Sequence, residues 1–188
     1  IRGNEFGFTD ASVAGDGTND TYIYTWGDIQ KDTLNTATRK THSYGDTGLY
    51  AIKLWVRDDN GCYDSISKST RVHPNPTAKF SQTDSAQCLD ANSFAFTQQS
   101  VSGSLNASLT YAWDIADTNS TAASPLIKYA TAGSRNIELI VSNAFSCKDT
   151  ANSALRVYAL PNPAFAINDS TQCENDHQFV FTNASHIG

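Results

Sequence analysis

Apolar and polar side chains alternate along several short stretches of the chain. Residues 50–56 place apolar side chains at every second position, and residues 137–141 do the same. Residues 22–26 and 109–113 form a second matched pair of alternating stretches. A period of two is the signature of a β-strand with one buried face. Since no stretch shows the longer period of an amphipathic helix, we predict an all-β protein.

Turn-forming residues separate these predicted strands. Asn60-Gly61, which lies between one strand and Tyr63, is a strong hairpin signal. Gly15-Asp16-Gly17 and Ser102-Gly103 have the same turn chemistry. Short strands with turns every 8–12 residues or so are typical of an immunoglobulin-like β-sandwich.

The sequence repeats with a period of about 85 residues. Cys62 and Cys147 are 85 positions apart, and so are Cys88 and Cys173. The same spacing relates further pairs of residues: Tyr44 and Tyr129, Gly48 and Gly133, Ile52 and Ile137, Leu54 and Leu139, Val56 and Val141. Regular self-similarity of this kind predicts tandem β-sandwich repeats.

A third copy of the repeat begins near the end of the chain. Phe6, Phe94 and Phe179 each open the sequence Phe-x-Phe-Thr. We therefore expect one repeat over residues 1–73 that lacks its first strand, a second over 74–160, and the start of a third over 161–188. This organisation suggests a segment of a longer array.

The inward-facing side chains of the first repeat are predicted from the alternation and the aromatic positions. They are Phe6, Phe8, Tyr24, Trp26, Ile52, Leu54 and Val56. The equivalent residues of the second repeat are also expected to face inward. We interpret these aromatic residues as core packing rather than as a binding platform.

Charge and hydropathy exclude several classes of partner. The net charge is -6, and lysines and arginines are scattered singly, so the chain has no basic patch for nucleic acid. No apolar run approaches the roughly 18 residues of a membrane span.

No arrangement of residues indicates catalysis. There is no Gly-x-Ser-x-Gly motif, the four histidines lie in unrelated contexts, and we assign His42 a structural role. We therefore predict that the chain is not an enzyme and has no cofactor. A minor hypothesis is structural calcium held by Asp16, Asn19 and Asp20, whose oxygen atoms suit that ion, against a simple solvated loop.

The four cysteines predict disulfides in an oxidising compartment, because their number is even and no zinc-type spacing occurs. Two pairings compete. Cys62–Cys88 and Cys147–Cys173 each span 26 positions across a Pro-Asn-Pro junction, whereas Cys88–Cys147 stays within one repeat. We favour the first, because the last hairpin and the start of the second strand lie at opposite poles of a standard sandwich. Free thiols are the remaining alternative.

The order of the motifs resembles that of the PKD (polycystic kidney disease) domain. His42-Ser43-Tyr44, residues 48–58 and Trp113-Asp114 follow its pattern, although Arg135 stands where the second copy should carry tyrosine. The cysteine positions further resemble repeats of large Bacteroidota surface proteins. In that group such repeats build gliding-motility adhesins and cargo of the type IX secretion system.

The same resemblance implies O-glycosylation, because glycoproteins of that phylum are modified at Asp-Ser/Thr followed by an aliphatic residue or threonine. Candidate acceptors are Thr33, Ser65, Ser85, Thr150 and Ser170. Asp-Ser and Asp-Thr are also ordinary turn sequences, and this alternative stays open.

The resemblance implies an extracellular, cell-surface location and a non-catalytic role as the stiff stalk of an adhesin or filament. The expected partners are neighbouring repeats and, at the surface, polysaccharide or other proteins. The alternative is an accessory domain that binds carbohydrate or protein in a large secreted hydrolase. Trp55 is the only candidate for such a platform, and the second repeat has Ile140 at that place.

Overall fold

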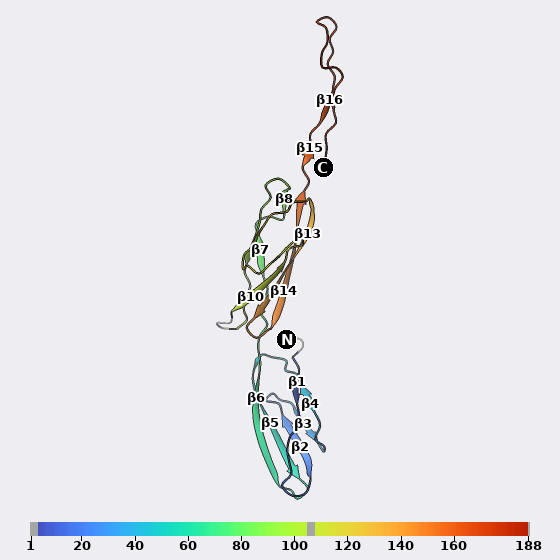
Figure 1. Cartoon of the computed structure of the whole chain (residues 1–188). Helices are drawn as coiled ribbons and strands as arrows, with labels where there is room; N and C mark the ends of the chain where they lie inside the picture. Colours follow the sequence, from blue (N-terminus) through green and yellow to red (C-terminus); the bar gives the residue numbers. More distant parts are fainter. Residues whose placement is uncertain (1–3, 105–107, 188) are drawn as a thin grey trace. The chain divides into compact units, whose positions relative to one another are not determined.

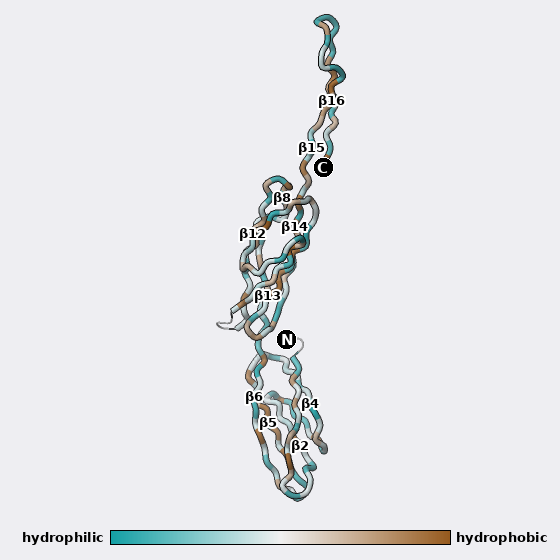
Figure 2. Tube along the Cα trace, viewed as in Figure 1, coloured by the Kyte–Doolittle hydropathy of each residue, from teal (hydrophilic) through white to brown (hydrophobic). Residues whose placement is uncertain are grey.

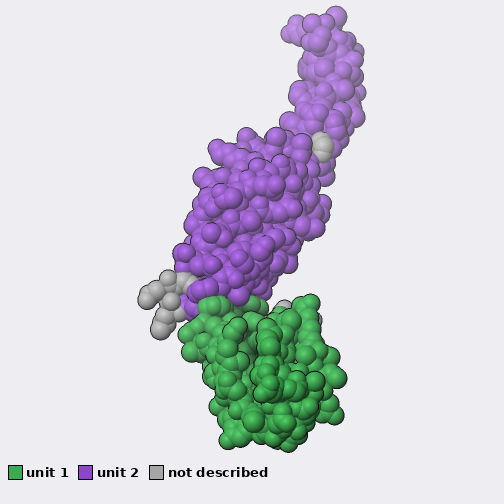
Figure 3. Space-filling model, turned by 60° about the horizontal axis from the view of Figure 1, so that its bottom comes forward, with its two compact units in different colours: residues 1–75 green, residues 76–188 purple. Residues whose placement is uncertain are grey.

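The chain divides into two compact units, residues 1–75 and 76–188, coloured separately in Figure 3. The computed structural model describes residues 4–104 and 108–187, and within these ranges every regular element is a β-strand. Tandem immunoglobulin-like sandwiches are thus confirmed. Figure 1 labels the strands, and each unit is described by itself below.

Unit 1 packs a four-stranded antiparallel sheet against a two-stranded one. The larger sheet has the order β3-β2-β5-β6, and the smaller one pairs β1 with β4. The strands are β1 (Phe6–Phe8), β2 (Asn19–Thr25), β3 (Lys31–Leu34), β4 (Lys40–His42), β5 (Gly48–Asp58) and β6 (Tyr63–Val72).

Unit 2 repeats this plan with two additional strands near its start. Its sheets have the orders β11-β10-β13-β14-β8 and β12-β9-β7. The strands are β7 (Phe80–Gln82), β8 (Ala86–Cys88), β9 (Phe94–Gln98), β10 (Leu109–Asp114), β11 (Asn119–Ser120), β12 (Leu126–Ile127), β13 (Gly133–Asn143) and β14 (Lys148–Tyr158). Strands β9 to β14 correspond in order to β1 to β6, whereas β7 and β8 have no counterpart among the described residues of unit 1.

A long hairpin contributes buried residues to the core of each unit. In β13, buried residues alternate with less buried ones, as the sequence pattern predicts. In β5 the alternation is clear only up to Ile52, and residues 53–56 are all intermediate. Figure 2 colours both strands by hydropathy. Trp26 and Trp113 are 1% and 2% exposed, and each lies at the centre of its own cluster. Each unit therefore has its own hydrophobic core.

The two cores are not equally closed. Ile137, Leu139 and Val141 are fully buried in unit 2. In unit 1 only Ile52 of the corresponding three is buried, and Leu54 and Val56 are partly exposed. Of the other residues predicted to face inward, Tyr24 is buried, whereas Phe6 and Phe8 are only partly covered.

The last part of the chain forms a narrow two-stranded ribbon. It consists of β15 (Pro161–Asn162), β16 (Phe165–Ile167), β17 (Phe181–Asn183) and β18 (His186–Ile187), with β15 paired to β18 and β16 to β17. Its register reproduces that of β7 and β9. Phe165 pairs with Asn183 as Phe80 pairs with Gln98, at the repeat spacing of 85 on both sides.

Candidate functional site

Three of the four cysteines lie at the ends of strands, and the fourth lies in a loop. Cys62 and Cys147 occupy equivalent positions in the β5–β6 and β13–β14 turns, Cys88 ends β8, and Cys173 lies between β16 and β17. All four thiols are unpaired in the structure.

Strand register separates Cys88 from Cys147. Strand β8 pairs in parallel with the last residues of β14, so that Cys88 stands beside Tyr158. Cys147 precedes the first residue of the same strand, and eleven residues of β14 lie between the two ends. That span is roughly 35 Å, whereas a disulfide needs Cα atoms within about 7 Å. The pairing Cys88–Cys147 therefore does not fit this fold.

The favoured pairs, Cys62–Cys88 and Cys147–Cys173, stay predictions. These pairs would require the chain after each Pro-Asn-Pro sequence to fold back along the preceding strand. In the described residues, β7 pairs with β9, β15 pairs with β18 and β16 pairs with β17. These segments instead pair within their own repeat, which does not support such a path.

The candidate glycosylation residues are accessible. Thr33, Ser85, Thr150 and Ser170 are exposed, and Ser65 is half-buried. Since their hydroxyl groups lie at or near the surface, the fold leaves room for a glycan at four of the five positions.

The acidic loop does not present its carboxylates together. The Asp20 carboxylate lies 3.2 Å from the Arg57 guanidinium, and hydrogen bonds from Thr21 and Arg57 lower the pKa of Asp20. Asp16 instead offers its backbone carbonyl to Asn60. Within the described ranges, no group of three or more acidic, histidine or cysteine side chains is arranged to hold a metal ion. Calcium at Asp16, Asn19 and Asp20 stays a hypothesis.

His42 is buried in the core of unit 1. Its Nε2 lies 2.9 Å from Oδ2 of Asp28, and its ring stacks on Trp26 at 4.7 Å. Burial alone would raise the pKa of Asp28, but hydrogen bonds from His42 and from the Gln30 backbone lower it. Ile127 occupies the equivalent place in unit 2. The pair ties β4 to the turn after β2, which fits the structural role predicted for His42.

Trp55 forms a small surface cluster on the outer face of β5. Lys53 Nζ lies 3.7 Å from the centre of its ring, and the Tyr63 ring lies 6.1 Å away. The side chain is half-buried, and no second exposed tryptophan stands beside it in the described residues.

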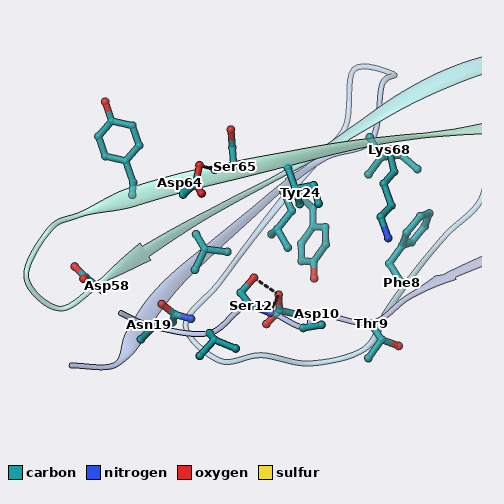
Figure 4. Close-up of a pocket in the computed structure, with 18 of the residues that line it drawn as sticks. Phe8, Thr9, Asp10, Ser12, Asn19, Tyr24, Asp58, Asp64, Ser65 and Lys68 are labelled. Carbon is teal, nitrogen blue, oxygen red and sulfur yellow. Dashed lines mark hydrogen bonds between the residues drawn. The ribbon is translucent and has the colours of Figure 1, made fainter. Parts of the chain in front are cut away.

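Unit 1 has a groove of about 710 Å³ between the β5–β6 hairpin and the segment 7–15. Phe8, Ile52, Leu54 and Val56 line its floor. The Tyr24 hydroxyl points into it, as Figure 4 shows, and is the one buried side-chain oxygen or nitrogen without a hydrogen-bond partner in the described residues. Sequence reasoning did not identify this groove, because the residues that line it come from segments far apart in the sequence.

Comparison with known proteins supports the PKD part of the resemblance. Residues 2–74 match the PKD domain family. PKD domains are commonly structural extracellular modules of surface proteins and proteases, and such modules are generally non-catalytic. Among curated proteins, none matches the chain.

Three solved structures are similar in part. The PKD1 domain of the Vibrio cholerae metalloprotease PrtV is 26% identical over 45% of this chain and 98% of its own, with a TM-score of 0.38. The PKD1 domain of Vibrio anguillarum Epp is 23% identical over 46% and 96%, with a TM-score of 0.39. The fibronectin(III)-like modules of Clostridium thermocellum CbhA are 14% identical over 82% and 85%, with a TM-score of 0.43.

The described residues contain no helix long and apolar enough to cross a membrane.

Proposed function

We propose that this chain is a non-catalytic, load-bearing segment of a stiff stalk in a secreted cell-surface protein of the adhesin type. The observation that carries the proposal is the position of the chain entry and exit in unit 2. At the entry, the Ala78 backbone N–H donates to Asp149 at the start of β14. At the exit, the chain leaves from Tyr158 at the other end of that strand.

Because the chain enters and leaves the unit at opposite ends, each repeat in an array would add its own length. Eleven residues of β14 correspond to roughly 35 Å, and repeats that contact only their neighbours lengthen an array without a larger core. The partners of the segment in this proposal are the neighbouring repeats. The tip that binds surface polysaccharide or another protein lies elsewhere in the protein.

The pairing of β8 with β14 suits a segment under tension. The two strands are parallel, with β8 near the start of unit 2 and β14 at its end. A pull on the two ends therefore moves these strands in opposite directions along their length. All the hydrogen bonds between β8 and β14 are then loaded at once, in shear. The unit therefore resists extension better than a pair of strands that separates from one end, one hydrogen bond at a time.

Single-molecule pulling on the chain, held at its two ends, tests the stalk proposal. We expect a separate high-force event for unit 2, and we expect Gln87→Pro to lower that force, because proline removes a backbone donor from the middle of β8. Ser104→Pro, in a loop of the same unit, is the control. Extension of unit 2 without a resolved force peak would contradict the proposal.

Secretion, disulfides and glycans belong to the same proposal, and a non-reducing peptide map of the natively purified protein tests them. Linked Cys62–Cys88 and Cys147–Cys173 peptides, with sugar mass at Thr33, Ser65, Ser85, Thr150 or Ser170, are the expected result. Free thiols and an unmodified mass would remove the support for a Bacteroidota type IX cargo and leave a tandem PKD-like sandwich.

The alternative function is an accessory binding module of a secreted hydrolase, and the half-buried ring of Trp55 beside the exposed Tyr63 is the feature that favours it. Retention of the chain on insoluble polysaccharide, lost on Trp55→Ala, would support that alternative over the stalk. We expect no retention, because unit 2 has Ile140 at the equivalent position and the aromatic surface is not repeated.

A further inference from the structure

The outer face of the four-stranded sheet in unit 1 carries an apolar row beside a cationic row. Residues at every second position of these strands face away from the core, since the residues between them, such as Tyr24 and Ile52, are buried in it. Strand pairing aligns the outward-facing residues in rows across the sheet. One row is Thr33, Ile23, Trp55 and Ser65, and the row beside it is Lys31, Thr25, Lys53 and Ser67.

The equivalent face of unit 2 carries an apolar row beside an acidic row. Strands β10, β13 and β14 correspond to β2, β5 and β6, and they align the same two rows. The first is Ala112, Ile140 and Thr150, and the second is Asn119, Asp114, Glu138 and Asn152. Because Glu138 stands 85 positions after Lys53, the two units have opposite charges at the same place of the repeat.

The acidic row is not neutralised within its own unit. Asp114 and Glu138 lie directly opposite each other on neighbouring strands, where like charges repel. Among the residues that the structure describes, neither carboxylate belongs to a salt bridge, and neither does the ammonium group of Lys31 or of Lys53. Each of the two charged rows therefore presents charges of one sign that a partner of the opposite sign can pair.

We propose that this face of unit 1 binds the equivalent face of unit 2 in a second copy of the chain, sheet against sheet. Two sheets that pack face to face keep their strands roughly aligned, and turning one face onto the other reverses its strand order. The apolar rows then lie on each other, with Ile140 over Ile23 and Ala112 over Trp55. The small side chain of Ala112 leaves room for the large indole, and the apolar surface of both rows leaves water.

The same alignment brings the two charged rows together. Asp114 lies over Lys53. Glu138 lies over Thr25, between the two lysines of the row. The Lys53 ammonium group lies over the Trp55 ring, 3.7 Å from its centre, so the charge that Asp114 meets stands beside the apolar row. Pairing with the lysines then relieves the repulsion between Asp114 and Glu138.

Charge also decides which faces can meet. Unit 1 on unit 1 would bring lysines against lysines, and unit 2 on unit 2 would bring carboxylates against carboxylates. The contact therefore joins different units of two copies, and each copy keeps one face free for a further copy. This lateral association goes beyond the stalk proposal, which needs only contacts between successive repeats.

Sedimentation velocity of the full chain at low ionic strength tests this contact. Four strands about 4.8 Å apart make a face about 20 Å wide, which is small for a stable interface. We therefore expect weak association, with a dissociation constant of about 0.1 mM. The species should grow beyond dimers as concentration rises and should dissociate in about 0.5 M salt. A chain that stays monomeric up to about 1 mM would overturn the proposal.

Two charge-reversal variants separate the two faces. Lys31→Glu/Lys53→Glu makes both faces acidic, and Asp114→Lys/Glu138→Lys makes both basic. Each variant alone should associate at least about tenfold more weakly than the unaltered chain, because its faces then repel each other. Circular dichroism and thermal unfolding establish that each variant is folded.

Lys79→Glu/Lys128→Glu is the matched control. It reverses the charge of two exposed lysines next to strands β7 and β12, in the smaller sheet of unit 2. This control has the same net charge as Lys31→Glu/Lys53→Glu, and it should associate like the unaltered chain. An equal loss of association in the control would reduce the effect to net charge and overturn the proposal.

Mixing the two face variants gives the decisive result. Acidic faces of one variant then meet basic faces of the other at every contact, so an equimolar mixture should recover the association of the unaltered chain. A mixture that stays monomeric although both variants are folded would overturn the proposal. A salt-dependent stabilisation that the variants abolish, but that does not depend on protein concentration, would place the contact within one chain and equally overturn it.

Discussion

At the scale of single residues, the two units share an asparagine that holds a tyrosine backbone in place. Asn92 is 4% exposed, accepts from the Tyr129 N–H and donates to the Tyr129 carbonyl, with both contacts at 2.8 Å. Asn4 makes the same two bonds to Tyr44, at 2.8 and 2.9 Å. A side chain used in this way in both units is part of the repeat, even though its spacing of 88 differs from that of the cysteines.

Asn92→Ala should lower the free energy of unfolding of unit 2 by about 2 kcal/mol or more, because it leaves a buried N–H and a buried carbonyl unpaired. Denaturant unfolding followed by tryptophan fluorescence measures this change. Asn152→Ala, at an exposed position of β14, is the control and should change stability little. Equal effects of the two substitutions would show that the buried bonds contribute nothing.

The two tyrosines whose backbones these asparagines bind should lose their hydroxyl protons only at unusually high pH. Burial raises the pKa of Tyr44 and of Tyr129 to about 12, and their hydroxyls donate to the carbonyls of Trp26 and Ile115. An unfolded tyrosine has a pKa of about 10. Since the folded pKa is the higher one, the stability from these groups is complete below about pH 10 and is lost as pH rises towards 12.

Absorbance titration at alkaline pH checks this sign. Two of the tyrosines should remain protonated after the exposed ones have ionised, and Tyr129→Phe should remove one of them. If every tyrosine ionised near pH 10 in the folded protein, the burial argument would be wrong.

At the scale of elements, the turns of the two long hairpins share one hydrogen-bond pattern but build it from different residue types. Asp58 Oδ1 accepts from the N–H of Asn60 and of Cys62. Asn143 Oδ1 does the same for Phe145 and Cys147. The left-handed position in these turns is Gly61 in one unit, with φ of 84°, and Ser146 in the other, with φ of 64°.

Exchanging these two residues should change the two units in opposite directions. Ser146→Gly should stabilise unit 2 by about 1 kcal/mol, and Gly61→Ser should destabilise unit 1 by about as much, because a Cβ is unfavourable in the left-handed region. No atom lies within 4 Å of a Cβ added at Gly61, so a serine there meets conformational strain alone. Thermal unfolding of the two variants measures both changes, and effects of the same sign would contradict the explanation.

At the scale of the whole molecule, two separate cores predict two unfolding transitions. The cluster around Trp113 includes fully buried residues of β9, β10, β13 and β14. The cluster around Trp26 leaves Leu54, Val56 and Phe8 partly exposed beside the groove. Since hydrophobic stabilisation scales with buried apolar area, unit 1 should unfold first.

Calorimetry of the intact chain tests this order. Trp26→Ala should lower the first transition and leave the second in place, and Trp113→Ala should do the reverse. A single transition that both substitutions shift equally would mean that the units unfold together.

Much of the fold could be predicted from the sequence, and the candidate groove could not. The alternation in residues 50–56 and the hairpin at Asn60-Gly61 are local signals, and the structure has β5, its turn and β6 where they indicate. The partial exposure of Val56 in the groove depends instead on contacts between segments that are distant in the sequence. Val141 occupies the equivalent position in unit 2 and is fully buried, in a core against which Phe80 of β7 also packs.

The sequence by itself determined the all-β class, the period of 85 and the strand faces, because a period of two and turn residues act over a few positions. Only the tertiary structure decided which cysteines stand at which end of a strand, which polar groups meet and where a core is open. Parallel pairing of β8 with β14 places Cys88 at the end of β14 that is far from Cys147. The hydrogen bond from Asn92 to the Tyr129 carbonyl joins two residues that are 37 positions apart in the sequence. Such contacts depend on the register between distant strands, which no local pattern encodes.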